Sequence, residues 1–128
     1  MGSAEEIGQI RGIHYVISSS DISASIKFYQ ETLGFQEIFR KPDFVRYSIW
    51  GTFLDVTHRA VTKENQNLSV NSLNEPHIAL EVDHNQYNHM KWLLARKDVT
   101  LLELSDSEGK NKMFFQDPDG NLIAIITE

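Results

Sequence analysis

The chain has 128 residues, with 12 Lys and Arg against 18 Asp and Glu, so its formal charge is −6. The length suits one domain, and the ordinary share of hydrophobic and charged residues excludes wholesale disorder. The acidic balance argues against a broad nucleic-acid surface, and no apolar run approaches the roughly 20 residues of a membrane-spanning helix. The absence of cysteine excludes disulfides, thiolate metal sites and a cysteine nucleophile. Since the start also lacks the features of a secretory signal, we expect a cytoplasmic protein.

The first half of the chain predicts a strand, a helix and three further strands. Residues 11–18 are rich in β-branched and aromatic side chains, which is typical of a strand. A helix over 22–33 follows a run of capping residues, carries an apolar stripe at helical spacing and stops before Gly34. The three strands expected after it are 35–41, 44–50 and 53–58.

The same pattern restarts after a polar linker. Its strand, 76–82, opens on a proline, which is tolerated at the first position of a strand. Asp83 can cap a helix over 84–97. Three strands follow, at 100–104, 112–116 and 121–127. The last is preceded by a turn that has Pro and Gly at positions favoured in turns.

The chain is therefore a tandem of two units of similar length. We predict the α+β class, with two tandem βαβββ modules that form a cupped mixed β-sheet. In each module the helix covers one face of the sheet, and the other face must bury itself or line a site. The expected divisions of this single compact domain are a tail (1–9), a first module (10–58), a linker (59–75) and a second module (76–128).

Three passages resemble one known family. His14 lies in a first strand that is followed by a helix signature, Asp21–Phe35. Pro76–Val82 is similar to the strand that opens the family's second module, and Phe114–Ile123 to its closing hairpin. With the repeat, residues 10–127 resemble the vicinal oxygen chelate superfamily, which contains glyoxalase I, extradiol dioxygenases, fosfomycin-resistance enzymes and bleomycin-binding proteins.

The resemblance implies a divalent metal in the cup, bound by the first and last strands of each module. Carried over, the ligands are His14, Asp55 and His77, while the fourth position, usually Glu, holds Ala124. Two imidazoles and one carboxylate could hold Zn²⁺, Fe²⁺, Mn²⁺, Co²⁺ or Ni²⁺. Glu81 is an alternative to the missing ligand.

Strand alternation allows these side chains to share a surface. In the first strand Ile13 and Tyr15 are expected to face the helix, which leaves His14 toward the cup. The same alternation places His77 and Asp55 on the cup face of their own strands.

Two functions remain open from the sequence. In one, the protein is a metal-dependent lyase, isomerase or dioxygenase-type enzyme, in which Asp55 moves the proton. In the other, the cup binds or sequesters a small molecule without metal, as in bleomycin-resistance proteins. The replacement of the usual glutamate by Ala124 favours the second, and the two retained histidines favour the first.

A ligand in the cup calls for aromatic area and a few polar groups. Arg46 could meet an anionic ligand, and Trp50 could stack on a planar one. The exposed sheet edges, and the habit of family members of this size, also predict a homodimer. The expected substrate-binding residues are Phe44, Arg46, Trp50, Phe53 and Phe115.

Overall fold

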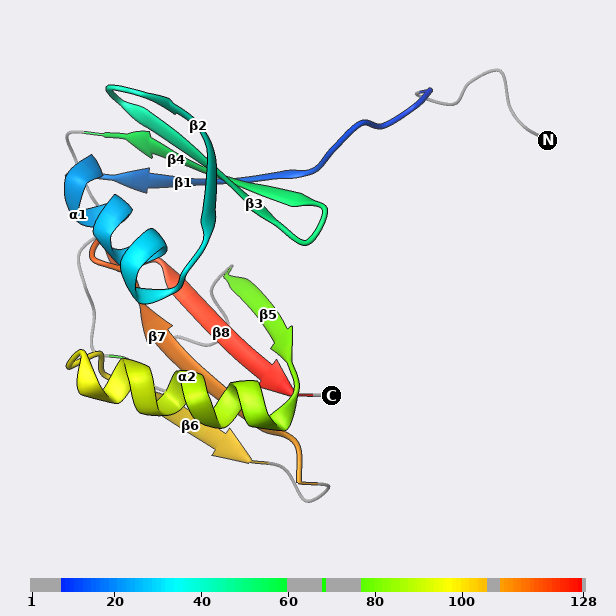
Figure 1. The fold of residues 1–128 in the computed structure, drawn as a ribbon, viewed down its shortest axis with the longest axis vertical. Helices are drawn as coiled ribbons and strands as arrows, with labels where there is room; N and C mark the ends of the chain where they lie inside the picture. Colours follow the sequence, from blue (N-terminus) through cyan, green and yellow to red (C-terminus); the bar gives the residue numbers. More distant parts are fainter. Residues whose placement is uncertain (1–7, 60–67, 69–76, 106–108, 128) are drawn as a thin grey trace.

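The computed structural model describes residues 8–59, 68, 77–105 and 109–127. Within these residues the chain forms two modules of the same design, each with the order strand, helix and three strands (Figure 1). The first module contains β1 (His14–Ser19), α1 (Ile22–Ile26), η1 (Lys27–Thr32), β2 (Gln36–Lys41), β3 (Phe44–Ile49) and β4 (Thr52–His58). The second contains β5 (Ile78–Val82), α2 (His84–Arg96), β6 (Leu102–Ser105), β7 (Asn111–Gln116) and β8 (Leu122–Thr127).

The eight strands divide equally between two sheets. Their orders are β1-β4-β3-β2 and β5-β8-β7-β6. In each sheet the first strand of the module runs parallel to the last, and the other pairs are antiparallel. The predicted α+β class with two βαβββ modules is therefore confirmed. One detail is wrong: Ile13, expected to face the helix, precedes β1 and is 65% exposed.

The helix of the first module differs from the regular α-helix that the sequence predicts. α1 begins after Asp21, whose side chain accepts a hydrogen bond from the Ala24 amide, but after one turn the chain widens into the π-helix η1. A wider helical turn changes the directions in which successive side chains point. Adjacent Phe28 and Tyr29 then both reach the core, with their rings 5.2 Å apart in an edge-on contact.

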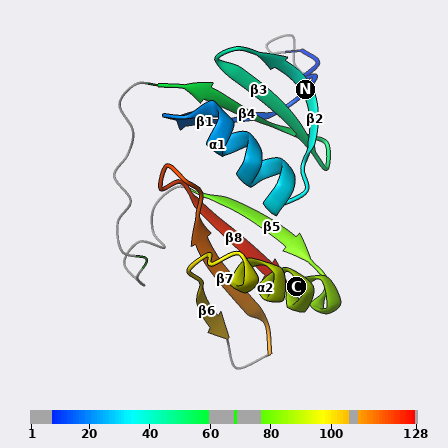
Figure 2. The same ribbon diagram turned by 60° about the vertical axis from the view of Figure 1, so that its left-hand side comes forward.

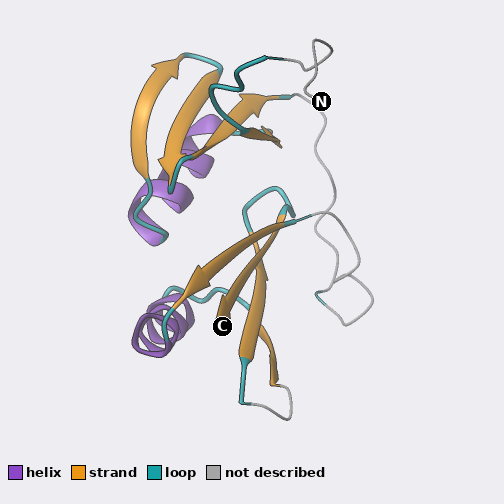
Figure 3. Ribbon diagram, turned by 90° about the vertical axis from the view of Figure 1, so that its right-hand side faces the viewer, coloured by secondary structure: helices purple, strands orange, loops and turns teal. Residues whose placement is uncertain are grey.

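One hydrophobic core joins the two modules. Figures 2 and 3 show α1 lying between the first sheet and the second module, while α2 covers the second sheet. The core includes Tyr29, Tyr47 and Leu54 from the first module and Phe115 and Ile125 from the second. Burial of large apolar side chains from both modules makes each depend on the other for stability.

A buried polar contact reinforces this junction. The predicted turn before β8 forms, and its two carboxylates reach the first module. The Tyr29 hydroxyl donates to Asp117 Oδ2 at 2.6 Å. The Ser20 amide and hydroxyl donate to Asp119 Oδ1 at 3.0 Å and 2.8 Å. Burial raises the pKa of both Tyr29 and Asp117. The turn is thus a docking element as well as a chain reversal.

Parts of the predicted domain organisation fall outside the described residues. These include most of the tail 1–9 and most of the linker 59–75, so the boundaries of these segments stay a prediction. In the described part of the chain, no helix combines the length and apolar character needed to cross a bilayer.

Candidate functional site

The two faces of the first sheet differ in chemistry. Side chains of β1, β3 and β4 that point toward the helix are buried in the core. Alternate residues point the other way, to what we call the outer face of the first sheet. His14, Arg46 and Asp55 meet there, each from a different strand. This confirms that His14 and Asp55 share a surface.

Asp55 is the centre of this group. Arg46 donates from Nε to Asp55 Oδ1 at 2.8 Å and from Nη2 to Oδ2 at 3.1 Å. His14 Nδ1 lies 2.9 Å from Oδ2. Burial favours the neutral carboxyl, but the hydrogen bonds from Arg46 and His14 outweigh it and hold the pKa of Asp55 below its usual value. Since an ionised carboxylate can only accept, Nδ1 of His14 carries the proton of that bond.

A close approach of backbone and ring fixes His14 from the other side. Its ring stacks on Phe53 with centroids 4.7 Å apart. A Cβ at Gly12 would lie 3.0 Å from the Phe53 ring, so a larger residue there would require this ring to shift. The imidazole is therefore held by a ring and a carboxylate together.

The repeat relates this group to the second module. In the two parallel pairs, Val16 lies opposite Asp55 and Ala79 lies opposite Ala124. His14 comes two residues before Val16, and His77 comes two residues before Ala79. Asp55 and Ala124 therefore occupy equivalent positions, and the second module has a methyl group where the first has a carboxylate. Ala124 is buried in a small cluster with apolar neighbours, Phe114, Leu122, Leu68, Leu102 and Ile126.

The donors that one chain brings together do not fit a divalent metal. In the described part of the chain no three His, Asp or Glu side chains cluster closely enough to hold an ion. His77 lies edge-on to Phe114, with ring centroids 5.9 Å apart, and does not join His14 and Asp55. Both oxygens of Asp55 are already held, and the Arg46 charge beside them repels a cation. The roles of His14, Asp55 and His77 as ligands stay a prediction.

The predicted substrate-binding residues are distributed over three places. Arg46 lies over the Phe44 ring, 5.2 Å from its centroid, on the outer face. Phe115 is fully buried in the core, where its ring lies 6.2 Å from that of Phe28. Trp50 and Phe53 line a cavity instead. The structure thus does not bring the five residues together at one site.

This cavity has a volume of about 710 Å³ and takes walls from both modules. On one side are Tyr15, the residues that follow η1 and the β3–β4 hairpin. On the other side are both faces of the edge strand β5 and the first half of α2. The sequence did not point to most of these residues, because they become neighbours only when the modules dock. The lining residues are Tyr15, Leu33, Phe35, Ile49, Trp50, Thr52, Phe53, Leu54, Ile78, Ala79, Leu80, Glu81, Val82, Gln86 and Met90.

A smaller hollow of about 460 Å³ lies on the outer face of the first sheet. Arg46 is part of its wall, with Phe39, Lys41 and His58. Lys41 and Arg46 both lie near the Phe39 ring, at 5.7 Å and 5.9 Å from its centroid. The hollow continues the surface that carries His14 and Asp55, and the sequence did not predict the part of Phe39 or Lys41 in it.

Comparison with known proteins extends these findings. The chain is 26% identical over 121 residues to metallothiol transferase FosB of Staphylococcus haemolyticus, covering 92% of this chain and 84% of that protein. In fold it is similar to a glyoxalase/dioxygenase from Nostoc punctiforme, with a TM-score of 0.77 and 19% identity over 100% of this chain and 98% of that one. It is also similar to lactoylglutathione lyase from Agrobacterium tumefaciens, with a TM-score of 0.73 and 14% identity over 95% of each chain.

The family comparison covers nearly all of both modules. The model of the glyoxalase/bleomycin resistance protein/dioxygenase superfamily matches residues 12–125, from just before β1 to the middle of β8. The paired βαβββ modules and this match agree, and the chain belongs to the glyoxalase/bleomycin resistance protein/dioxygenase superfamily.

Proposed function

We propose that this protein binds a small molecule in the cavity between its modules and does so without a bound divalent metal. The observation that carries the proposal is the two-point hydrogen bonding of Arg46 to Asp55. A planar guanidinium matches a carboxylate in this geometry, and the pair is among the stronger hydrogen-bonded contacts in proteins. A metal that used Asp55 would have to displace Arg46 or share the carboxylate with it.

The second module supports the same proposal. At the position equivalent to Asp55, Ala124 offers no donor and lies within an apolar cluster. A charged ligand there would have to be desolvated among apolar side chains, which is costly without a partner. The carboxylate that the resemblance leads one to expect in the second module therefore has no substitute at this place.

The cavity supplies the binding capacity. Its volume of about 710 Å³ lies within the roughly 300–1,000 Å³ usual for small-molecule sites. Its walls are mainly aliphatic and aromatic, with Thr52, Glu81 and Gln86 as polar groups. Two predicted substrate-binding residues, Trp50 and Phe53, line it. An amphipathic molecule suits such walls better than a strongly polar one.

We also infer that the functional unit is a homodimer. Val16 and Phe39 are 60% and 44% exposed on the outer face of the first sheet, beside the group of His14, Arg46 and Asp55. Large exposed apolar side chains on one face favour association. Sedimentation equilibrium should give twice the monomer mass, and Val16→Lys should shift the species toward the monomer. A parent protein that sediments as a monomer would contradict this inference. A cytoplasmic location stays a prediction.

Metal analysis tests the central proposal. Untagged protein would be stripped with a chelator, incubated separately with Zn²⁺, Fe²⁺, Mn²⁺ and Ni²⁺, desalted and measured by elemental analysis beside a His14→Ala, His77→Ala double variant. We expect substoichiometric metal that does not differ between the two proteins. Near-stoichiometric metal in the parent that is lost in the variant would overturn the proposal and support the metal-dependent enzyme, with Asp55 as its catalytic carboxylate.

A further inference from the structure

We infer that the ligand of the cavity between the modules is an organic ammonium ion with an apolar body, whose charged nitrogen is held by Glu81 and by aromatic rings. This inference rests on the proposed function, because it names the class of ligand that the same cavity takes.

The composition of the cavity wall is the first observation. Four aromatic side chains line it, namely Tyr15, Phe35, Trp50 and Phe53, and Glu81 is the one charged residue in the wall that the structure describes. The face of an aromatic ring carries negative electrostatic potential and attracts cations, most strongly for tryptophan. A glutamate and four aromatic residues in the wall of one cavity therefore favour a cation and disfavour an anion.

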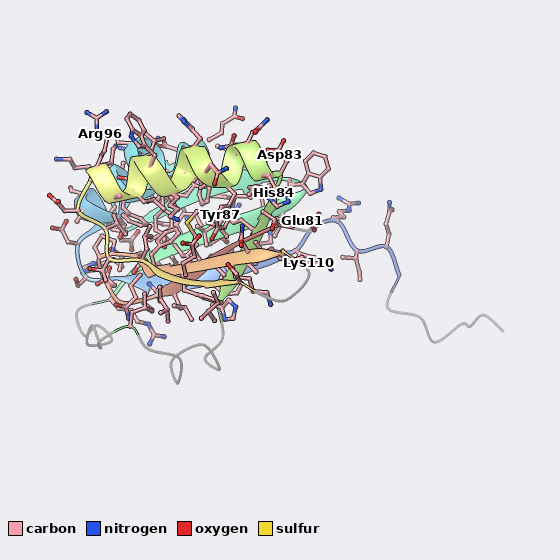
Figure 4. All side chains as sticks on the ribbon, turned by 90° about the horizontal axis from the view of Figure 1, so that it is seen from below. Glu81, Asp83, His84, Tyr87, Arg96 and Lys110 are labelled. Atoms are coloured by element: carbon pink, nitrogen blue, oxygen red, sulfur yellow. The ribbon has the colours of Figure 1, made fainter. Side chains whose placement is uncertain are left out.

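The second observation is that the Glu81 carboxylate is available. Glu81 is an exposed residue of β5, and in the described part of the chain its carboxylate has no hydrogen bond or ion pair. Figure 4 shows Glu81 beside the beginning of α2, close to Asp83 and at the opposite end of the helix from Arg96. Lys110 projects toward the same end of the molecule but is not part of the cavity wall.

The neighbourhood of Glu81 adds negative charge. Asp83 follows it by two residues and caps α2, accepting a hydrogen bond from the Gln86 amide at 2.7 Å. Gln86 itself lines the cavity. Two carboxylates at this end, in a chain of net charge −6, attract a cationic ligand and repel an anionic one.

The third observation concerns Trp50. It is 99% exposed and has a positive φ of 44°, in the left-handed region that a bulky residue rarely adopts. With Gly51 at φ 74°, it forms the two-residue connection between β3 and β4. In the described part of the chain its ring contacts no other ring. A strained, fully exposed tryptophan at the wall of a cavity points to a role in ligand contact rather than in folding.

The remaining wall determines the body of the ligand. Ile78, Leu80 and Met90 are apolar and belong to the second module, whereas the aromatic rings belong to the first. The ligand is thus expected to bridge the modules, with an aliphatic or aromatic body on the apolar wall and its nitrogen toward Glu81.

Three probes that share one body and differ in charge test the inference. They are 2-naphthylmethylammonium, neutral 2-naphthylmethanol and 2-naphthoate, titrated into the full-length protein by calorimetry. We expect the ammonium to bind about threefold to tenfold more tightly than the alcohol, the range between an exposed ion pair and a hydrogen bond to a charged group. The naphthoate should bind most weakly. Trp50→Ala should weaken the ammonium more than the alcohol, because only the cation is attracted by the face of the ring.

Variants show where the probes bind and separate the class of ligand from the proposed function of the cavity. Glu81→Gln should reduce the preference for the ammonium to the share that the aromatic rings supply, while binding of the alcohol is retained. Glu31→Gln, on an exposed residue of η1, should leave the preference unchanged. Ala79→Phe, which places a ring in the cavity, should block all three probes. Equal binding of ammonium and alcohol to the parent would refute the inference and leave the proposed function standing. Binding of no probe, or binding that Ala79→Phe does not reduce, would refute both.

Discussion

Two buried tyrosines that lie side by side should respond in opposite ways when each loses its hydroxyl. Tyr29 and Tyr47 are both fully buried, and their ring centroids are 5.9 Å apart. The Tyr29 hydroxyl donates to Asp117 at 2.6 Å across the junction of the modules. The Tyr47 hydroxyl has no hydrogen-bond partner in the described part of the chain, and burial raises its pKa to about 12.

The magnitudes follow from these different environments. A hydrogen bond to a charged group contributes about 1.5–3 kcal/mol, so Tyr29→Phe should destabilise by about that amount. Asp117 keeps bonds from the Asn121 side chain and amide, both at 2.8 Å, which favours the lower half of the range. A buried polar group without a partner costs about 1–3 kcal/mol, so Tyr47→Phe should be neutral or stabilising by about 1 kcal/mol.

Urea unfolding of the parent and the two variants measures the difference. With a slope of about 2 kcal/mol per molar urea, the midpoints of the variants should lie roughly 1 M or more apart, with Tyr29→Phe the lower. Near-ultraviolet circular dichroism checks that both variants keep native packing. If Tyr29→Phe costs no more than Tyr47→Phe, the Tyr29–Asp117 bond does not hold the modules together, and the reasoning is refuted.

Three further changes test other parts of the structure. Trp50→Asn should raise the free energy of unfolding by about 1 kcal/mol, because Asn tolerates the left-handed conformation of this hairpin. A lower urea midpoint for the variant would show that the backbone of Trp50 is not strained. Phe28→Ala should lower the free energy of unfolding by about 2 kcal/mol, because the half-buried ring of Phe28 contacts Tyr29 and Phe115. Urea unfolding measures this loss, and no loss would show that the π-helical turn does not matter for packing. Hydrogen bonds from Lys91 and Tyr87 hold the pKa of Glu103 below its usual value in the folded protein. Ionised Glu103 therefore stabilises the fold at pH values above its pKa in the unfolded chain, and this stabilisation is lost as the pH falls through its pKa in the folded protein. Unfolding at a series of pH values should therefore show a smaller acid loss for Glu103→Gln than for the parent, and equal losses would exclude the contribution.

The sequence was most informative where the signal is local. The order of elements could be predicted from alternating β-branched and aromatic residues, from the capping residues Asp21 and Asp83, and from the turn before β8. Each of these signals depends on a few neighbouring residues. The expected strand boundaries differ from the observed ones by at most three residues. The same local alternation placed His14 and Asp55 on one face. It failed at Ile13, since alternation does not say where pairing with a neighbouring strand begins.

The site depends on contacts that no local pattern encodes. Nothing in the spacing of residues 46 and 55 says that Arg46 will hold both oxygens of Asp55; that follows from the register of β3 against β4. Phe115 could be predicted to lie in a strand, but only the docking of α1 and η1 against the second module decides that it is buried. The widening of the first helix into η1 was likewise not predicted from the sequence, which indicated a regular α-helix.

The sequence by itself thus determined the repeat, the class of fold and the residues offered to the outer face of the first sheet, since these follow from periodicity and from residue type. Only the tertiary structure decided how those residues are used. Asp55 pairs with Arg46, Trp50 turns to the wall of a cavity, and Glu81 joins it there. The physical reason is that each of these contacts joins segments separated along the chain, and they become neighbours only when the strands pair and the two modules bury a common core.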